Sequence, residues 1–423
     1  MMILGLLILL VTCPFSLLFE FHHFDTQKKE LLEKLGDTGI HLDSLSGAIK
    51  VTNASNNFGL TLYHALPDSG NLFISPFSLS TVLTMAYLGA RNSTAQQMSY
   101  ALGYSRVGLD ASGVLSGLQQ TNDLLNSQKN SYDLEAANAV LVQRGLGLLA
   151  VYQQALTEYL GAVLQEVDFA TEEVKVQYEV NSWASRQTKN KISKLLDKPL
   201  PKDSLLALLN AVYFKGTWQT MFDQKLTQSE TFYNNGRTPV TVRMMHSKSK
   251  FPFFYDSKLG VYALEMPYRG SHISMLILLP DNRNGLLHLE DALSIPYLQN
   301  IYNRLQDRRV EVAMPRFKLE AKYEDDLKRT LQQMGMSDVF DPSRANLAGI
   351  TRQRGLYLTK VIHKSYIEVN EEGSEAAAVS VVVGAERIGG RNDEQFIANH
   401  PFIFLIRDYR TGLILFLGRV NEL

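Results

Sequence analysis

Residues 371–380 read Glu-Glu-Gly-Ser-Glu-Ala-Ala-Ala-Val-Ser, and three valines follow them directly. The residues after Gly373 are small, and Glu375 is the only charge before Glu386. Such a segment suits two environments: an exposed loop, or a β-strand that slides between two strands already in place. The plain alternative is an alanine-rich helix followed by a buried valine strand.

If the segment is a strand, its side chains alternate between two faces, one of which would enter the sheet. No proline would interrupt the hydrogen bonding of such a strand. It would add on the order of ten backbone hydrogen bonds at a net ~0.5–1.5 kcal/mol each. That sum is comparable to ~5–15 kcal/mol, the stability of a whole domain. The face that would enter a sheet carries only residues small enough to be packed there, which are Ser374, Ala376, Ala378, Ser380 and Val382.

The segment and its lead, Lys364-Ser365-Tyr366-Ile367-Glu368-Val369-Asn370, resemble the hinge of the reactive-centre loop of serpins, a family of serine protease inhibitors. The resemblance spans roughly residues 46–420, and the order and spacing of its motifs are specific. The hinge and the C-terminal third look most like neuroserpin-like members. The further motifs are Asn71–Ser80, Met85–Arg91, Asn210–Trp218, Met314–Phe317, Leu331–Met336, Asn399–Arg407 and Phe416–Val420.

This resemblance implies the serpin fold, an α+β architecture with three β-sheets, about nine helices and an exposed reactive-centre loop. It places one large domain at residues 46–423, although the length alone would suggest two or three domains. Local patterns agree with it: Val82–Ala86 has helical spacing, and Ile273–Pro280 has the character of a buried strand that ends in a turn.

The resemblance also implies the roles of the loop residues. The hinge comprises Gly373, Ser374, Glu375, Ala376, Ala377 and Ala378. With the usual loop spacing of the family, Gly373 is the fifteenth residue before the cut. Arg387 and Ile388 then flank the reactive bond. An arginine before the cut requires an acidic specificity pocket, hence a trypsin-like serine protease.

Two regions of the sheet are expected to control insertion. By resemblance, His363 lies opposite Ser75 and Ser78 in the shutter, where the sheet opens. Without the resemblance, a lone histidine in this apolar run would be a satisfied core residue, and both readings make it buried and hydrogen-bonded. The breach is where the loop first enters the sheet. We expect it at Glu371, Asn210, Lys215 and Trp218, although core packing alone would also explain the tryptophan.

The composition supports a sizeable core and gives no sign of catalysis. Apolar residues make up 45% of the chain and the net charge is −1, so nothing argues for nucleic acid as a partner. The chain has no G-x-S-x-G, no H-E-x-x-H, no phosphate-binding loop and no cysteine pair. Catalysis therefore has no support in the sequence, and with the resemblance we expect an inhibitor and not an enzyme, with no metal and no cofactor.

A heparin-type cofactor site would need clustered lysines and arginines. The segment expected to form the cofactor helix, Leu115 to Asp133, holds only Lys129. No heparin site of the usual kind is therefore expected. The resemblance implies that the partner is a trypsin-like serine protease, bound covalently, and that the chain is a monomer. Spaced lysines elsewhere could form a weaker basic surface but are typical of a solvated face: Lys189, Lys191, Lys194 and Lys198.

The N-terminus predicts secretion to the extracellular space. Residues 1–19 are almost wholly apolar and read as a signal peptide, although the run is just long enough for a membrane anchor. The only cysteine, Cys13, lies within it. Residues 20–45 form a polar N-terminal extension. Two glycosylation sequons begin at Asn53 and Asn92, and the second of them is expected to be exposed.

The first functional hypothesis is a secreted suicide-type inhibitor that is cleaved after Arg387 and traps the acyl-enzyme as its loop inserts. The alternative is a non-inhibitory serpin that acts as a carrier or as a secretory-pathway chaperone. The chaperone reading rests on a faint retention-like tail, Val420-Asn421-Glu422-Leu423. The hinge sequence discriminates between the inhibitory and the non-inhibitory hypothesis. Non-inhibitory serpins tend to have bulky, charged or proline residues where this chain has Ser374 and three alanines.

Overall fold

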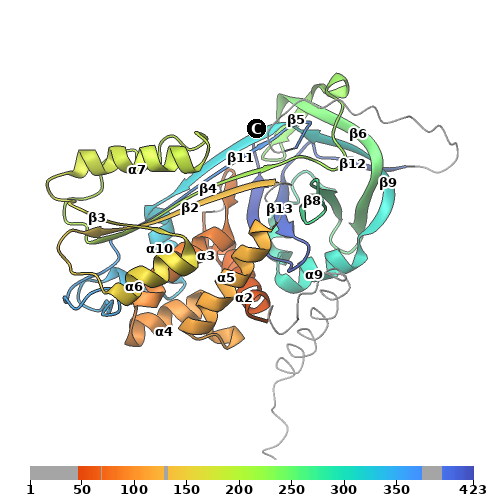
Figure 1. Cartoon of the computed structure of the whole chain (residues 1–423). Coiled ribbons are helices and arrows are strands. Elements are labelled where there is room, and N and C mark those ends of the chain that lie inside the picture. Colours follow the sequence, from red (N-terminus) through yellow and green to blue (C-terminus); the bar gives the residue numbers. More distant parts are fainter. Residues whose placement is uncertain (1–45, 68, 128–131, 374–392) are drawn as a thin grey trace, which may run out of the picture. The chain divides into compact units, whose positions relative to one another are not determined.

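The structure is a computed structural model that describes residues 46–67, 69–127, 132–373 and 393–423 (Figure 1). The predicted signal peptide and the polar extension lie outside the described residues, and so do residues 374–392 of the loop. The chain divides into two compact units, Met1–Ser46 and Gly47–Leu423. Everything that follows concerns the second unit and the helix that begins at Ser46.

Nine α-helices lie in the described part of the chain, in agreement with the number expected. The first begins where the expected domain begins. Their bounds are α2 Ser46–Ala65, α3 Pro76–Gly89, α4 Asn92–Ala101, α5 Ala111–Asn126, α6 Ala150–Gln154, α7 Glu173–Gln187, α8 Leu286–Ala292, α9 Ile295–Arg304 and α10 Asp325–Gln333. Of these described helices, none is both long and apolar enough to cross a membrane.

Helix α3 shows how local sequence sets one of these bounds. Ser75 is the N-cap, with extended backbone, and its side chain accepts a hydrogen bond from the backbone N–H of Ser78. Pro76 follows at the first helical position, where its missing N–H costs nothing. Nearly every residue of the helix is buried, so it forms a central support of the core.

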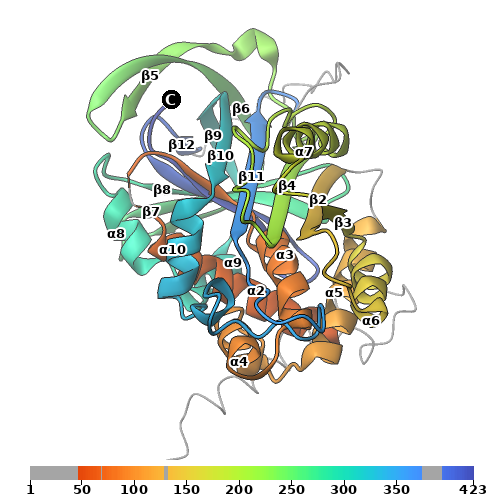
Figure 2. The same cartoon turned by 90° about the vertical axis from the view of Figure 1, so that its left-hand side faces the viewer.

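Five strands form a mixed sheet in the order β10-β11-β4-β2-β3 (Figure 2). Its outer pairs are β10 with β11, antiparallel, and β2 with β3, parallel. At the centre, β11 and β4 are parallel, while β4 and β2 are antiparallel. The bounds are β2 Tyr132–Gln143, β3 Val163–Val167, β4 Leu206–Gly216, β10 Phe317–Tyr323 and β11 Lys360–Val369.

The remaining nine strands of the described residues join through the long strand β6. Residues 253–256 of β6 pair with β7, and earlier parts pair with β5 and β9, so β6 is shared by two sheet regions. With the five-stranded sheet these make the expected three-sheet α+β fold. Their bounds are β1 Leu72–Ile74, β5 Gln228–Asn234, β6 Thr238–Asp256, β7 Val261–Pro267, β8 Ile273–Pro280, β9 Gln306–Pro315, β12 Glu394–Ile397, β13 Phe402–Asp408 and β14 Ile414–Val420.

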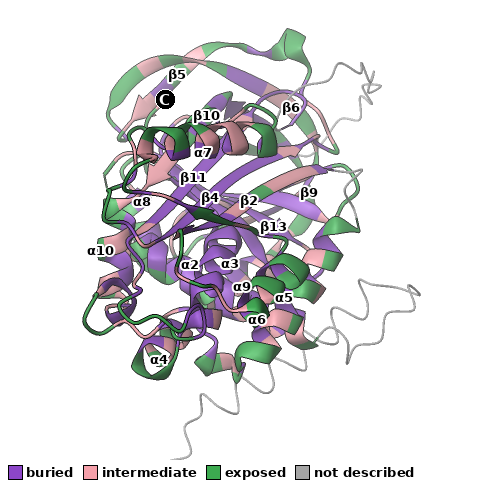
Figure 3. Ribbon diagram, turned by 60° about the vertical axis from the view of Figure 1, so that its left-hand side comes forward, coloured by how far each residue is buried: buried purple, intermediate pink, exposed green. Residues whose placement is uncertain are grey.

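Both faces of the five-stranded sheet are covered, because alternate residues of its central strands enter two separate apolar clusters. In β4, Leu208, Val212 and Phe214 belong to the large cluster shared with α3 and the other sheets. Ala207, Leu209 and Tyr213 belong to a smaller cluster with α7. Figure 3 shows these strands as largely buried between α7 on one side and α3 on the other.

Candidate functional site: the seam between β4 and β11

The hinge begins at a tight turn at the end of β11. Asn370 and Gly373 exchange two backbone hydrogen bonds of 2.8 and 3.2 Å, which leaves two glutamates as the turn. Gly373 is also paired, in antiparallel sense, with Thr217, the first residue after β4. The chain therefore enters the space between the ends of β11 and β4 already in strand pairing with both. We call the parallel pair of β4 and β11 the seam.

Residue 373 must be glycine for this pairing. Its φ of +139° lies in a region that side-chain-bearing residues rarely adopt. A Cβ built there would lie 1.9 Å from the carbonyl oxygen of Gly216 and 2.8 Å from the backbone nitrogen of Trp218. The close approach of two backbones is thus the reason for the glycine.

Trp218 holds the turn from beside β4. Its backbone N–H donates to the carbonyl of Glu372 at 2.8 Å, and its indole N–H donates to the carbonyl of Asn370 at 3.0 Å. The indole is fully buried and stacks on Tyr268, with the ring centroids 4.4 Å apart. Core packing and a contact with the turn are therefore both present, and the two interpretations of this residue do not exclude each other.

Glu371 is fixed by three partners although its side chain is buried. The hydroxyl of Thr227 donates to one carboxylate oxygen at 2.7 Å, and Arg316 forms an ion pair with the other at 3.6 Å. Its carbonyl accepts a hydrogen bond from the backbone N–H of Phe222 at 2.9 Å. Lys215 is the penultimate residue of β4, half-buried and in register with Asp133. Glu371 and Lys215, two of the four residues expected at the breach, thus lie at this end of the sheet.

A second polar cluster lies midway along the seam, on the face that covers α3. His363 of β11 is in register with Asn210 of β4 and is fully buried. Its Nδ1 and the amide oxygen of Asn210 are 2.5 Å apart, and its Nε2 accepts the backbone N–H of Ser75 at 3.1 Å. The Asn210 amide donates to the hydroxyl of Ser78 at 2.5 Å and to the side-chain oxygen of Asn138 at 2.7 Å.

This hydrogen bonding fixes the charge state of His363. Because Nε2 accepts from Ser75, the proton of the neutral ring lies on Nδ1 and is donated to Asn210. Burial lowers the pKa of His363 from its ordinary 6.5 to about 3. A second proton, on Nε2, would point the ring N–H at the backbone N–H of Ser75, so that two donors would face each other. The cluster is therefore built for a neutral histidine and joins both strands of the seam to α3.

Asn210 corrects the sequence-based assignment. We predicted it at the breach, yet it lies in the shutter cluster with His363 and Ser78. The reason is strand geometry. Asn210 of β4 lies seven residues before Thr217, which pairs with Gly373, and each residue of a strand adds about 3.3 Å, so Asn210 is far from the turn. The chain thus brings Ser75, Ser78, Asn210 and His363 together, and groups Glu371 and Trp218 separately around Gly373.

Comparison with known proteins decides the family. A family model described as "Serpin (serine protease inhibitor)" matches residues 53–423. The chain belongs to the serpin family. Intracellular coagulation inhibitor 1 of Tachypleus tridentatus is 48% identical to this serpin over 377 residues, which cover 89% of this chain and 90% of the relative.

Two further similarities extend over most of the serpin. Leukocyte elastase inhibitor of Sus scrofa is 38% identical over 383 residues, which cover 88% of this chain and 99% of the relative. The crystal structure of Serpin48 from the insect Tenebrio molitor matches with a TM-score of 0.77 and 30% identity, covering 88% of this chain and 98% of that one. The family and the names of these relatives place the chain among protease inhibitors and not among enzymes.

The other predicted site residues of this serpin fall in three places. Asn53 is half-buried on α2, and Asn92 is exposed at the start of α4, as expected. Ser374, Glu375, Ala376, Ala377 and Ala378 lie outside the described residues, as do Arg387 and Ile388. Within the described residues, no group of three or more His, Cys, Asp or Glu side chains is arranged to hold a metal ion.

Sequence reasoning missed several partners of the seam residues in this serpin. Thr227 and Arg316 hold Glu371, Tyr268 stacks on Trp218, and Asn138 completes the shutter cluster. Arg316 falls within a recognised motif, which could have marked it. No local pattern marks Thr227, because its role depends on a contact with a residue 144 positions away.

Proposed function

We propose that this serpin is a secreted suicide-type inhibitor of trypsin-like serine proteases, cleaved after Arg387. In this proposal, the protease attacks the bond to Ile388 and forms an acyl-enzyme. The freed loop then enters the seam as a new strand and carries the attached protease with it. The protease is trapped because its catalytic site is deformed before the acyl bond is hydrolysed.

The observation that carries this proposal is the pairing of Gly373 with both Asn370 and Thr217. A strand that continues from this residue between β11 and β4 would be antiparallel to both of its neighbours. The parallel pair of β4 and β11 would then be replaced by two antiparallel pairs, which are slightly more stable per residue. The first rung of that strand is already formed in the intact protein.

The seam is long enough to make insertion strongly favourable. β4 and β11 are in register over Lys360–Ile367 and Ala207–Phe214. A strand of that length adds on the order of eight backbone hydrogen bonds, each worth a net ~0.5–1.5 kcal/mol. The gain is comparable to ~5–15 kcal/mol, the stability of a folded domain. The small side chains of Ser374, Ala376 and Ala378 suit the buried face of this strand.

The specificity rests on the sequence after the hinge. Arg387 requires an acidic pocket in the protease, and Glu386 disfavours thrombin-like enzymes, which want a small residue or proline there. Arg387-Ile388-Gly389-Gly390 resembles the activation site of trypsin-like zymogens but lacks one valine. We therefore extend the proposal to a target that activates other protease zymogens; the alternative is that Gly389 and Gly390 only keep the loop flexible.

The location is proposed from the apolar N-terminus and the exposed Asn92. The relative from Tachypleus tridentatus is named as an intracellular inhibitor, so location requires its own test. We expect the full chain, expressed in cells with a secretory pathway, to appear in the medium without its first residues and with a glycan at Asn92. Retention of an unprocessed, unglycosylated chain inside the cells would contradict this part of the proposal.

Inhibition is tested by mixing the protein with a panel of trypsin-like proteases. We expect complexes that survive denaturation in SDS and a released peptide that begins at Ile388 by mass spectrometry. A peptide that begins at Asn392 would instead identify Arg391 as the cleaved residue. Cleavage without any stable complex would favour the carrier or chaperone alternative.

A further inference from the structure

A cavity of about 330 Å³ lies at the end of the five-stranded sheet where β10 ends and β11 begins. It is lined by residues 196–201, which lead from α7 to β4, and by Lys322, Glu324 and Lys360. Pockets for small molecules in proteins begin at about 300 Å³. At ~30 Å³ for each water molecule, the cavity has room for about ten non-hydrogen atoms. No step of the proposed inhibition uses it.

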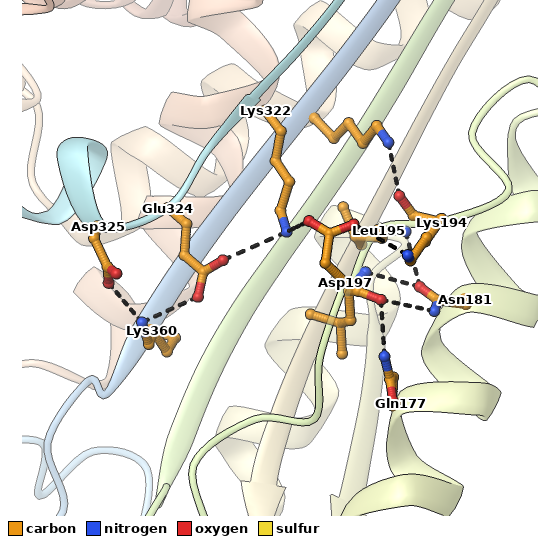
Figure 4. A network of polar contacts seen from close by, with 11 residues as sticks. Gln177, Asn181, Lys194, Leu195, Asp197, Lys322, Glu324, Asp325 and Lys360 are labelled. Atoms are coloured by element: carbon orange, nitrogen blue, oxygen red, sulfur yellow. Dashed lines mark hydrogen bonds and ion pairs between the residues drawn. The ribbon is translucent and has the colours of Figure 1, made fainter.

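One wall of the cavity is apolar. Leu196 and Leu200 are buried and belong to the apolar cluster beneath α7, and Pro199 and Pro201 lie beside them. Prolines have no backbone N–H to offer. The backbone N–H and carbonyl of Leu196 are both bound to the side chain of Asn181, at 2.8 and 2.9 Å (Figure 4). This wall therefore suits a hydrocarbon group better than a polar one.

The opposite wall carries two lysines that share one carboxylate. The Nζ of Lys322 lies 2.8 Å from Asp197 and 3.4 Å from Glu324, and the Nζ of Lys360 lies 3.0 Å from Glu324 and 2.5 Å from Asp325 (Figure 4). Hydrogen bonds from the lysines lower the pKa of Asp197 and of Asp325, so both are ionised at neutral pH. An ammonium group has three N–H donors. Each lysine thus keeps a donor for a further acceptor.

A third lysine leaves the cavity with an excess of positive charge. Lys198 is exposed, lines the cavity and forms no ion pair with any residue that the structure describes. The lining therefore has three lysines and two carboxylates. Two neighbours that pair with the lining, Lys194 and Asp325, cancel each other. The one positive charge in excess suits a ligand with a single anionic group.

We propose that this cavity binds a small organic monoanion, a carboxylate with a compact apolar body. The carboxylate accepts hydrogen bonds from Lys198 and from the lysines of the opposite wall, and the apolar body packs on Leu196, Leu200 and the two prolines. Inorganic phosphate has no group for the apolar wall, and a neutral lipid leaves the excess charge unpaired. The inference does not depend on protease inhibition, because it concerns a separate part of the molecule.

The test uses octanoate as the probe, followed by saturation-transfer NMR with the intact protein. We expect a dissociation constant on the order of 1 mM, the weak end of what about ten ligand atoms give. Acetate lacks the apolar body, octanol lacks the charge and inorganic phosphate lacks the hydrocarbon, so each should bind at least about tenfold more weakly. Binding of any of the three as tight as that of octanoate would overturn the inference, as would no binding of octanoate.

Variants of the segment before β4 locate the site. Lys198→Glu should weaken octanoate binding about tenfold, because it replaces the unpaired positive charge with a negative one, whereas Lys198→Arg should bind as the wild type does. Lys202→Glu is the matched control: it makes the same change of charge four residues on, at a lysine outside the lining that pairs with Glu173 at 3.0 Å. Wild-type affinity in Lys198→Glu, or an equal loss in Lys202→Glu, would contradict the assignment.

A second measurement needs only the wild-type protein, so it stands even if a variant does not fold. Reductive methylation of lysines, quantified by mass spectrometry, requires an accessible and uncharged amine. Octanoate at ten times its dissociation constant should slow methylation of Lys198 about tenfold and leave Lys202 unchanged. Equal rates at Lys198 with and without octanoate would place the bound octanoate elsewhere and sink the proposal. Protease trapping is scored separately, so its failure would refute the proposed function and not this site.

Discussion

Replacing Gly373 with alanine tests the role of the first rung directly. The added Cβ would lie 1.9 Å from the carbonyl oxygen of Gly216, far inside the 3.4 Å at which ordinary contact begins. The intact chain can relieve this clash by giving up the single rung at residue 373. An inserted strand cannot, because it is paired on both sides. The substitution therefore acts mainly on insertion.

The magnitude follows from what the inserted form must lose. Backbone strain at a φ of +139° costs about 1–3 kcal/mol for a residue other than glycine. The hydrogen bonds around the turn are each worth a net ~0.5–1.5 kcal/mol. A barrier raised by about 2–4 kcal/mol slows insertion roughly 30-fold to 1000-fold. We expect the acyl-enzyme to be hydrolysed before the loop can insert.

The assay is a titration of a trypsin-like protease with Gly373→Ala, read as the number of inhibitor molecules consumed per protease inhibited. The expected result is a large rise in that number, with cleaved monomer replacing the SDS-stable complex on gels. Gly335→Ala is the control, because Gly335 has a φ of +102° but no atom within 4 Å of the added Cβ. A wild-type value for Gly373→Ala, or an equal rise for Gly335→Ala, would refute the reasoning.

Three further outcomes are expected. Ser374→Arg should turn the protein into a substrate that is cleaved without forming a stable complex, because burying the arginine charge in the sheet costs roughly several kcal/mol. Complexes at the wild-type yield would show that residue 374 does not enter the sheet. Cleavage after Arg387 should raise the melting temperature sharply, whereas equal melting temperatures for intact and cleaved protein would mean that no strand is added. For His363, whose pKa is about 3 when folded and 6.5 ordinarily, the unfolded chain binds the extra proton as the pH falls. The free energy of unfolding should therefore decline from pH 6.5 toward pH 3, by at most about 1.4 kcal/mol per pH unit. In His363→Gln, the urea midpoint should fall less steeply over this range, because the histidine no longer contributes. The same pH slope in the variant and the wild type would contradict a neutral, buried His363.

The sequence was sufficient for features that depend on neighbouring residues. Helical spacing predicted a helix at Val82–Ala86, and these residues lie within α3. The prediction that the run from Gly373 to Ala378 can enter a sheet concerns residues that, after Gly373, lie outside the described part of the chain, and it stays a prediction. Ile273–Pro280, predicted as a buried strand, is β8 with the same bounds. In each case, the deciding interactions are within the segment itself or follow from side-chain size.

Features that depend on register between distant strands could not be derived in the same way. Asn210 was predicted at the breach end of β4 but lies midway along the strand, because only its pairing with His363 shows its place along the sheet. Lys189 and Lys194 were predicted to lie on a solvated face and are exposed, but their distant partners could not be predicted: Lys189 pairs with Asp133 and Glu135, and the backbone carbonyl of Lys194 accepts a hydrogen bond from Lys364. No periodic pattern in residues 188–205 predicts that this segment packs across β4 and β11.

The pairing of β1 with β14 has a consequence for how the protein is made. Asn71 and Asn421 are 350 residues apart and share a hydrogen bond, and β13 lies between β8 and β14 in the finished sheet. During synthesis, the edges of β1 and β8 therefore stay unpaired until β14 and β13, their partners, have been made. Exposed apolar edges of this kind invite pairing with other chains. The closing step of folding therefore belongs to β13 and β14, because without them neither edge has its partner.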